Sequence, residues 1–289
     1  MKIAIASGKG GTGKTTVAVN LYHFLSKKLQ NKVQLIDCDV EEPNDMLFLN
    51  HSNKAFEKEV FTLVPKIDTS KCTFCKKCSE WCEFNAITIV KNLQFAEVSN
   101  DLCHSCGACS VACDFGAITE YQRPLGVITE FTTGVGARVI EGRLEIGSAL
   151  QTSLIKEVKR YAEKPELLTL FDSPPGTSCP VVETVSDADY IILVTEPTPF
   201  GLYDLQLTVE LIRELGIPFG VIVNKSGLGS DDTYHYLEEN RIELIGNIPF
   251  SKEYASKYSK GEILHHIPEE IADYYRQAVE MLMQKMSVQ

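Results

Sequence analysis

Eight of the ten cysteines of this chain lie in two short blocks with the same spacing. The segments CTFCKKCSEWC and CHSCGACSVAC both follow the pattern C-x2-C-x2-C-x3-C. Thiolates gathered this densely in a 289-residue chain without a signal-like N-terminus indicate metal binding rather than disulfide bonds. The spacing is typical of [4Fe-4S] ligation, whereas zinc, the alternative, usually takes two separated C-x-x-C pairs. We therefore predict two [4Fe-4S] clusters, held by Cys72, Cys75, Cys78, Cys82, Cys103, Cys106, Cys109 and Cys113.

A glycine-rich loop near the N-terminus has the pattern of a phosphate-binding site. GKGGTGKT (Gly8–Thr15) fits G-x-x-x-x-G-K-S/T and lies between a strand-like run and a segment with helical spacing. Backbone amides at a helix N-terminus would cradle the phosphates, Lys14 would neutralise them and Thr15 would hold Mg2+. We therefore expect nucleotide binding by Gly8, Gly10, Gly11, Thr12, Gly13, Lys14, Thr15 and Thr16.

Polar residues also follow three further apolar runs of the chain. DCDVEEPN contains Asp37 and Asp39, FDSPPG contains Asp172 and Gly176, and VIVNKSG contains Asn224. Ligands of open parallel sheets bind outside the carboxyl ends of the strands, which is where these residues are expected. An aspartate at such a place can instead cap a helix, so each short segment alone is weak evidence.

Apolar runs and helix-length segments alternate along most of the chain. Runs such as KVQLIDCD, LLTLFDSPPG, YIILVTEP and PFGVIVNKSG each stop at Asp, Gly, Pro or Asn. This alternation predicts an α/β fold with a mostly parallel, doubly wound P-loop NTPase sheet.

The two cysteine blocks interrupt this alternation and repeat each other at an offset of 31 residues. Residues 72–88 and 103–119 share four cysteines and five further identities. Such a duplication predicts an inserted small α+β module with two repeats over residues 67–122. The nucleotide-binding domain would then comprise residues 1–66 and 123–289.

The second residue of the glycine-rich loop, Lys9, makes the motif more specific. KGGTGKT resembles the deviant Walker A signature of the MinD/Mrp and nitrogenase iron-protein class of P-loop ATPases. In that class this lysine reaches the nucleotide of the partner subunit, so the resemblance implies an ATP-dependent homodimer and Mg-dependent ATP hydrolysis. A solvated loop cation is the alternative reading of Lys9.

The resemblance also implies roles for the strand-end residues. Asp37 would support the Mg2+ shell, Asp39 would orient the attacking water, and Asp172 would be the Walker B aspartate. Gly176 resembles the γ-phosphate sensor. The resemblance further implies that Asn224 reads the adenine and that Pro249, in NIPF, belongs to the loop that closes over the base.

The cysteine blocks resemble bacterial two-cluster ferredoxins, in which the fourth cysteine of each run binds the other cluster. The resemblance implies one cluster on Cys72, Cys75, Cys78 and Cys113, and a second on Cys103, Cys106, Cys109 and Cys82. The proline that follows the fourth cysteine in that family is Glu83 in the first block and Asp114 in the second. These carboxylates would lower the cluster potentials if they stay close.

Composition restricts the partners of the chain. A formal net charge of -11 disfavours nucleic acid and anionic membranes, because binding either requires concentrated Lys and Arg. No stretch approaches the roughly 20 apolar residues of a membrane span. We expect a cytoplasmic protein with protein and small-molecule partners.

Two functions fit these features. The first is an ATPase that couples nucleotide-driven dimer switching to low-potential electron transfer toward a redox partner protein. The second is a maturation factor or scaffold for iron-sulfur or related metallocofactor assembly. In Mrp-like relatives the scaffold cluster is held by a C-x-x-C pair near the C-terminus, and no cysteine follows Cys179 in this sequence. A positioning ATPase of the ParA or MinD kind is a weaker third possibility.

Overall fold

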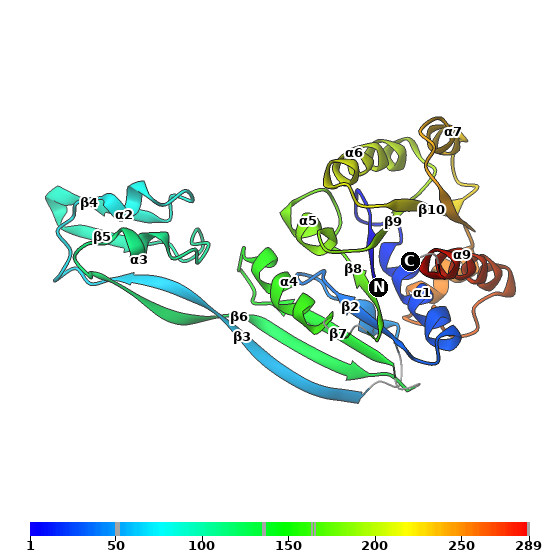
Figure 1. The fold of residues 1–289 in the computed structure, drawn as a ribbon, viewed down its shortest axis with the longest axis horizontal. Helices are drawn as coiled ribbons and strands as arrows, with labels where there is room; N and C mark the ends of the chain where they lie inside the picture. Colours follow the sequence, from blue (N-terminus) through cyan, green and yellow to red (C-terminus); the bar gives the residue numbers. More distant parts are fainter. Residues whose placement is uncertain (50–52, 135–136, 163, 165, 288–289) are drawn as a thin grey trace. The chain divides into compact units, whose positions relative to one another are not determined.

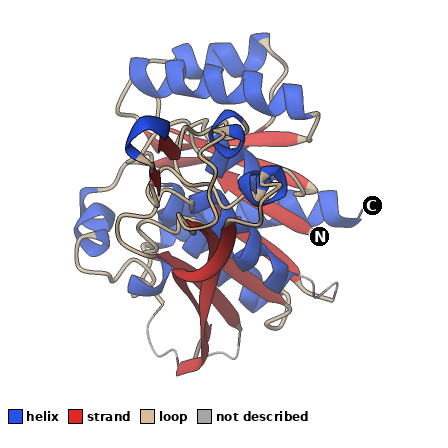
Figure 2. Cartoon of the chain, turned by 90° about the vertical axis from the view of Figure 1, so that its left-hand side faces the viewer, coloured by secondary structure: helices blue, strands red, loops and turns tan. Residues whose placement is uncertain are grey.

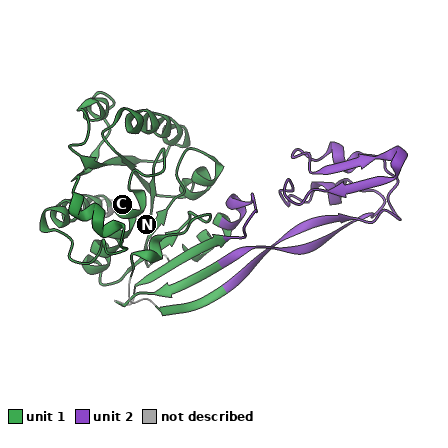
Figure 3. Cartoon of the chain, turned by 180° about the vertical axis from the view of Figure 1, so that it is seen from behind, with its two compact units in different colours: residues 1–57, 128–143, 155–289 green, residues 58–127, 144–154 purple. Residues whose placement is uncertain are grey.

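The computed structural model describes residues 1–49, 53–134, 137–162, 164 and 166–287. The chain divides into two compact units, which Figure 3 colours separately. Unit 1 comprises Met1–Glu57, Ile128–Arg143 and Ile155–Gln289, and unit 2 comprises Lys58–Val127 and Leu144–Leu154. Unit 1 carries the glycine-rich loop, and unit 2 carries both cysteine blocks.

A nine-stranded sheet is the main element of the fold. Its strands are β1 (Lys2–Ala6), β2 (Val33–Asp37), β3 (Asn53–Ile67), β6 (Ile118–Thr132), β7 (Arg138–Leu144), β8 (Leu168–Asp172), β9 (Tyr190–Thr195), β10 (Phe219–Ser226) and β11 (Leu244–Pro249). The order is β11-β10-β9-β1-β8-β2-β7-β6-β3, and every pairing from β11 to β7 is parallel. The predicted mostly parallel α/β sheet is therefore confirmed.

Helices cover both faces of the parallel part of this sheet (Figures 1 and 2). The α-helices outside the cysteine blocks are α1 (Lys14–Lys28), α4 (Gln151–Lys159), α5 (Cys179–Val185), α6 (Pro199–Leu215), α7 (Asp232–Glu239), α8 (Lys252–Tyr258) and α9 (Glu269–Ser287). α1 and α9 pack together on one face, while α5 and α6 lie on the other. Among the described residues, no helix has the length and apolar character needed to cross a membrane.

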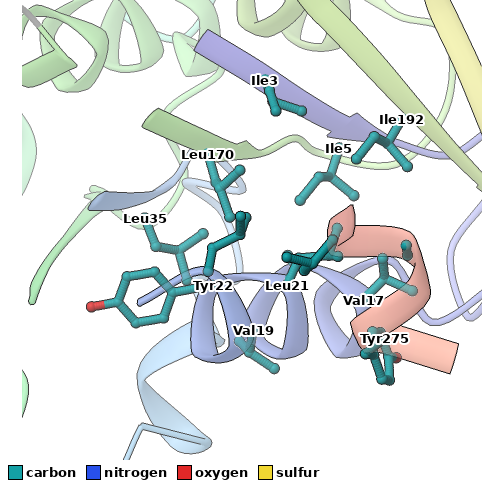
Figure 4. Close-up of a cluster of buried hydrophobic side chains, with 14 of the residues drawn as sticks. Ile3, Ile5, Val17, Val19, Leu21, Tyr22, Leu35, Leu170, Ile192 and Tyr275 are labelled. Carbon is teal, nitrogen blue, oxygen red and sulfur yellow. The ribbon is translucent and has the colours of Figure 1, made fainter. Parts of the chain in front are cut away.

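The main core of unit 1 lies between α1 and the central strands, as Figure 4 shows. Val17 and Leu21 of α1, Ile5 of β1 and Leu170 of β8 are fully buried there, and Tyr275 of α9 closes the cluster. Each such side chain contributes about 1.5–3 kcal/mol relative to leaving it exposed. This packing holds α1 against the sheet, and α1 starts at Lys14, directly after the glycine-rich loop that follows β1.

Unit 2 contains two copies of one small motif. Its local elements are α2 (Lys77–Glu80), α3 (Ala108–Ala112) and the antiparallel pair β4 (Ile87–Val90) and β5 (Phe95–Val98), which are joined through a 3-10 turn at Lys91–Leu93. The short 3-10 turns at Asp45–Leu47 and Arg160–Ala162 belong to unit 1. Positive φ angles recur at the offset of 31, in the pairs Phe74 and Ser105, Lys76 and Gly107, and Asn85 and Gly116. The amide of Asp68 donates to Ala117, and the equivalent amide of Ser99 donates to Ala86. The internal duplication predicted from the sequence is thus present in the backbone.

Candidate functional site

The glycine-rich loop joins β1 to α1 at the carboxyl edge of the parallel sheet. Gly11 and Gly13 have φ angles of 82° and 92°, which glycine adopts without strain. α1 begins at Lys14, and the first amides of a helix have no partner within it. The buried Thr12 Oγ1 also has no hydrogen-bond partner among the described residues. A helix N-terminus of this kind fits a bound phosphate group.

The loop borders a cleft of about 390 Å3 in unit 1. The cleft is lined by Ser7, Lys9, Gly10, Gly11, Gly13, Lys14, Thr15, Thr16, Asp39, Glu42, Asn44, Pro175, Asn224, Lys225, Pro249, Phe250, Ser251, Tyr254, Ala255 and Tyr258. Of the predicted nucleotide ligands, Gly8, Thr12 and Gly176 lie outside this lining. Gly8 packs against α6, and the amide of Gly176 donates to the Ser7 carbonyl at 2.8 Å.

Asn224, the expected base-reading residue, contacts the loop directly. Its Nδ2 donates to the carbonyl oxygen of Thr12 at 2.8 Å. A Cβ atom added to Gly13 would lie 2.1 Å from the same Nδ2. The close approach of β10 to the loop therefore requires glycine at position 13.

We expect Gly13→Ala to destabilise the nucleotide-free protein by about 1–3 kcal/mol, because the side chain must adopt a left-handed backbone and also displaces Asn224. Urea unfolding of the full chain measures this change. Gly10→Ala is the matched control, since a Cβ at Gly10 meets nothing within 4 Å. Equal stability of the two variants would contradict the prediction.

The side chains of Lys14 and Thr15 both donate hydrogen bonds to the carboxylate of Asp172. Lys14 Nζ donates to Asp172 Oδ1 at 2.7 Å, and Thr15 Oγ1 donates to Asp172 Oδ2 at 2.9 Å. Burial alone would lower the pKa of Lys14, but the nearby carboxylates, Asp172 above all, raise it above its usual value. Lys14 therefore carries its charge at neutral pH.

Asp37 and Asp39 lie where the sequence predicts, at the carboxyl end of β2. Asp37 is fully buried and accepts hydrogen bonds from the backbone amides of Asp39, Asn44 and Asp45. Burial and the Asp172 carboxylate raise the pKa of Asp37 to about 8. Burial likewise raises the pKa of Asp39, which lines the cleft, to about 6.

Because its pKa is raised, Asp39 should make the nucleotide-free protein less stable as pH rises. Between the ordinary value near 3.8 and about 6, the folded protein binds more protons at this group than the unfolded chain does. Asp39→Asn should therefore match the wild type near pH 4 and gain in relative stability up to about pH 6. Thermal unfolding at several pH values measures the difference, and a constant difference would contradict the assignment.

Asp45 is a site residue that the sequence analysis missed. It lies in the 3-10 turn after β2 and is fully buried. One carboxylate oxygen each of Asp37, Asp45 and Asp172 lies within 4.8 Å of the others. The sequence gives little indication of Asp45, because an aspartate in an irregular turn is usually exposed on the surface.

Lys9 pairs within the chain. Its Nζ lies 2.8 Å from Glu196 Oε1, and Lys225 Nζ contacts Glu196 Oε2 at 2.9 Å. Lys225 also donates to the Gly11 carbonyl at 2.7 Å. Glu196 therefore neutralises two lysines beside the loop, and Lys225 is a further loop contact that the sequence analysis did not identify.

The eight block cysteines converge on two separate pockets of unit 2. One pocket is lined by Cys72, Cys75, Cys78 and Cys113, together with Ile67, Thr73, Lys77, Ile89, Ala112, Phe115, Ala117 and Ile118. The other is lined by Cys82, Cys103, Cys106 and Cys109, together with Pro65, Phe84, Ala86, Ile87, Val98, His104, Gly107 and Ala108. Each quartet contains three cysteines of one block and the fourth of the other.

Backbone amides point at the sulfur atoms in both pockets. Phe74 N donates to Cys72 Sγ at 3.4 Å, and the equivalent Ser105 N donates to Cys103 Sγ at 3.4 Å. Ala86 N donates to Cys82 Sγ at 3.3 Å. Four thiolates in an apolar pocket with amide donors fit a [4Fe-4S] cluster, whose potential such hydrogen bonds tune.

Of the two carboxylates that replace proline, Asp114 is ion-paired. Its Oδ2 lies 2.7 Å from Nζ of Lys77, which lines the first pocket. A cation this close offsets the negative charge of Asp114, and both side chains are well exposed to solvent. The lowering of potential expected from Asp114 is therefore reduced.

The fold and the loop define a P-loop nucleotide-binding α/β domain. A family model described as the CobQ/CobB/MinD/ParA nucleotide binding domain matches residues 3–264. The chain therefore belongs to this P-loop NTPase family.

Relatives and solved structures agree with this assignment. The chain is 31% identical to an uncharacterised protein of Methanocaldococcus jannaschii, over 95% of this chain and 97% of that one. It is 22% identical to the iron-sulfur cluster carrier protein of the same organism, covering 99% and 84% of the two chains. The septum site-determining protein MinD of Pyrococcus horikoshii, solved with Mg-ADP, has a TM-score of 0.61 at 18% identity, covering 99% and 97%. At that identity, the MinD structure supports the fold alone.

Proposed function

We propose that this protein is an ATP-hydrolysing iron-sulfur protein that couples its nucleotide state to low-potential electron transfer. The observation that carries the proposal is the presence of a phosphate-binding cleft and two four-cysteine pockets in one chain. In this proposal residues 67–122 form an inserted ferredoxin-like domain, and residues 1–66 and 123–289 form the ATPase domain. Each pocket would hold one [4Fe-4S] cluster, which supplies one-electron chemistry.

The residues around the cleft support ATP hydrolysis with Mg2+. The amides of Gly10 to Thr15 bind the phosphates, and Lys14 exchanges Asp172 for a phosphate oxygen. The hydroxyl of Thr15 and the carboxylate of Asp37 provide oxygen donors of the kind that Mg2+ prefers. Asp39, with its raised pKa, orients the attacking water from the cleft wall.

The remaining cleft residues bind the base. Asn224 breaks its hydrogen bond to the Thr12 carbonyl and turns to the edge of the adenine. Its side-chain amide can donate a hydrogen bond to the base and accept one from it at the same time. Pro249 lines the same cleft and supplies an apolar surface for the base.

We further propose an ATP-dependent homodimer in which Lys9 reaches the nucleotide of the partner subunit. This movement requires Lys9 to leave Glu196, which keeps Lys225 as its counter-ion. Sedimentation of the full chain should show a dimer with a nonhydrolysable ATP analogue and a monomer with ADP. Lys9→Ala should stay monomeric with both, and a dimer in that variant would refute the role of Lys9.

Coupling between the two chemistries needs a physical connection. β3 and β6 each contain residues of both units, so two continuous strands join the ATPase part to the cysteine pockets. A nucleotide can alter electron transfer only if it favours one of two conformations that differ at the clusters.

The test is an anaerobic redox titration followed by electron paramagnetic resonance, with and without a nonhydrolysable ATP analogue. We expect about eight irons per chain and a midpoint potential or spin coupling that changes with the analogue. Eight irons with no nucleotide response would refute the coupling. Zinc in place of iron in anaerobically isolated protein would refute the cluster assignment as well.

A second candidate function is cluster delivery or metallocofactor maturation. It is favoured by similarity over nearly the whole chain to proteins named iron-sulfur cluster carrier protein, at 22% and 24% identity. Under this function, iron labelled in the protein should appear in an added cluster-free ferredoxin. Retention of the label together with electron transfer to a redox dye would favour the first function.

A further inference from the structure

We propose that Lys77 raises the reduction potential of one of the two cysteine pockets, so that the first electron taken up by unit 2 is held there. This first pocket is the one lined by Cys72, Cys75, Cys78 and Cys113, and the second pocket is the one lined by Cys82, Cys103, Cys106 and Cys109. The inference rests on the proposed pair of [4Fe-4S] clusters, and it adds an order of reduction to the proposed electron transfer.

The internal duplication shows where the two pockets differ. Lys77 lines the first pocket, and Ala108, which lies 31 positions later, lines the second. Each of the two residues begins the short helix of its block and directly precedes the third cysteine, Cys78 or Cys109. An ammonium group in one repeat is therefore replaced by a methyl group at the equivalent position of the other.

The ammonium of Lys77 acts on the sulfur atoms of the first pocket. A hydrogen bond and an ion pair with Asp114 raise the pKa of Lys77, and the charges of Cys75 and Cys113 act in the same direction. Lys77 therefore carries its positive charge at neutral pH. Reduction adds one electron, and thus one negative charge, to a [4Fe-4S] cluster, and a nearby cation stabilises that added charge.

Asp114 offsets only part of this positive charge. Its Oδ2 lies 2.7 Å from Lys77 Nζ, but the Asp114 side chain is 65% exposed and does not line the pocket, whereas that of Lys77 is 43% exposed and does. Solvent therefore screens the carboxylate more strongly than the ammonium. The equivalent carboxylate beside the second pocket, Glu83, is exposed and forms no ion pair within the part of the chain that the structure describes. Both differences favour reduction at the first pocket.

The backbone amides do not reverse this order. Phe74 N and Ser105 N each lie 3.4 Å from a cysteine sulfur, so this contact is the same in both pockets. Ala86 N adds one contact in the second pocket, at 3.3 Å from Cys82 Sγ, which favours reduction there. The potential of an amide dipole falls off more steeply with distance than that of a full charge, so the ammonium has the larger effect.

The experiment compares two variants of the full chain that each keep one pocket intact. Cys82→Ala combined with Cys103→Ala retains the first pocket, and Cys72→Ala combined with Cys113→Ala retains the second. Both are titrated anaerobically with dithionite and followed by electron paramagnetic resonance. We expect the variant with the first pocket to be reduced more easily, with a ratio of reduced to oxidised cluster roughly tenfold higher at a given potential, or about 59 mV for one electron.

Charge variants that keep all eight cysteines test Lys77 itself. Lys77→Gln should lower the higher of the two midpoint potentials by a similar amount and leave the lower one in place. Ala108→Lys, which puts an ammonium at the equivalent position, should raise the lower one. Lys91→Gln is the matched control, because Lys91 is an exposed lysine of unit 2 that lines neither pocket. His104 lines the second pocket, so the titrations are run at pH 8.5, where a free imidazole is neutral.

Equal midpoint potentials in the two single-pocket variants, or a higher one with the second pocket, would overturn the proposal. Unchanged midpoint potentials in Lys77→Gln would overturn it as well. Iron measured on the same samples tests the proposed function separately. A wild-type chain without iron would contradict the clusters themselves, whereas full iron content with the reverse order would contradict only the role of Lys77.

Discussion

Replacing Lys14 by glutamine is expected to lower the rate of ATP hydrolysis by about 100- to 1000-fold, the usual effect of removing one preorganised donor from a transition-state site. Lys14 begins α1 and lines the cleft, whereas Lys9 and Lys225, which line the same cleft, are both paired with Glu196. Initial rates of phosphate release at saturating MgATP measure the effect.

The same replacement should destabilise the nucleotide-free chain. Lys14 is 7% exposed and Asp172 is 0% exposed, and breaking a buried ion pair from one side typically costs about 3–5 kcal/mol. Lys27→Gln is the matched control, because Lys27 is an exposed lysine in the last turn of the same helix. A hydrolysis rate within a few-fold of the wild type would refute the assignment of Lys14.

Pairs of cysteine replacements should reveal how the cluster ligands are shared. In the proposed arrangement Cys72 and Cys113 bind the same cluster although they lie in different blocks. Cys72→Ala combined with Cys113→Ala should therefore retain about four irons per chain, because the other cluster is untouched. Cys72→Ala combined with Cys82→Ala should retain almost none, because the pair damages both clusters.

Iron and acid-labile sulfide, measured after anaerobic reconstitution, provide the readout. Cys179→Ala is the control and should retain about eight irons, since Cys179 lies on α5 in unit 1. If each block held its own cluster, the two double variants would exchange their results. That reversal would contradict the arrangement of the two pockets.

Much of unit 1 was predictable because its signals are local in sequence. The loop Gly8–Thr15 depends on glycines at fixed offsets, and β2 and β8 are short apolar runs that end at Asp37 and Asp172. The offset of 31 between the cysteine blocks likewise predicted a module with two repeats. Such features require no knowledge of which distant segments come together.

What the sequence could not show depends on contacts between distant residues. Lys225 contacts Gly11 across more than two hundred positions, and Asp114 pairs with Lys77 of the other block. Asp45 becomes significant only when the turn after β2 places it against β8. The length of β3 and β6, 15 residues each, was also not visible in their weakly alternating sequence.

The Asn224 amide, which the proposed function assigns to the base, has a hydrogen-bond partner within the protein, the carbonyl oxygen of Thr12. The two lysines that the proposed function assigns to phosphates are also paired within the protein, Lys14 with Asp172 and Lys9 with Glu196. Each part of a nucleotide must therefore break one of these internal contacts when it binds. Its measured affinity is the free energy of the new contact minus that of the internal contact that is lost. Adenosine and triphosphate, offered separately, should bind far more weakly than their joined affinity suggests, because neither fragment frees the whole loop. Under this proposal, selectivity for the intact nucleotide arises from the contacts that these three side chains make within the protein.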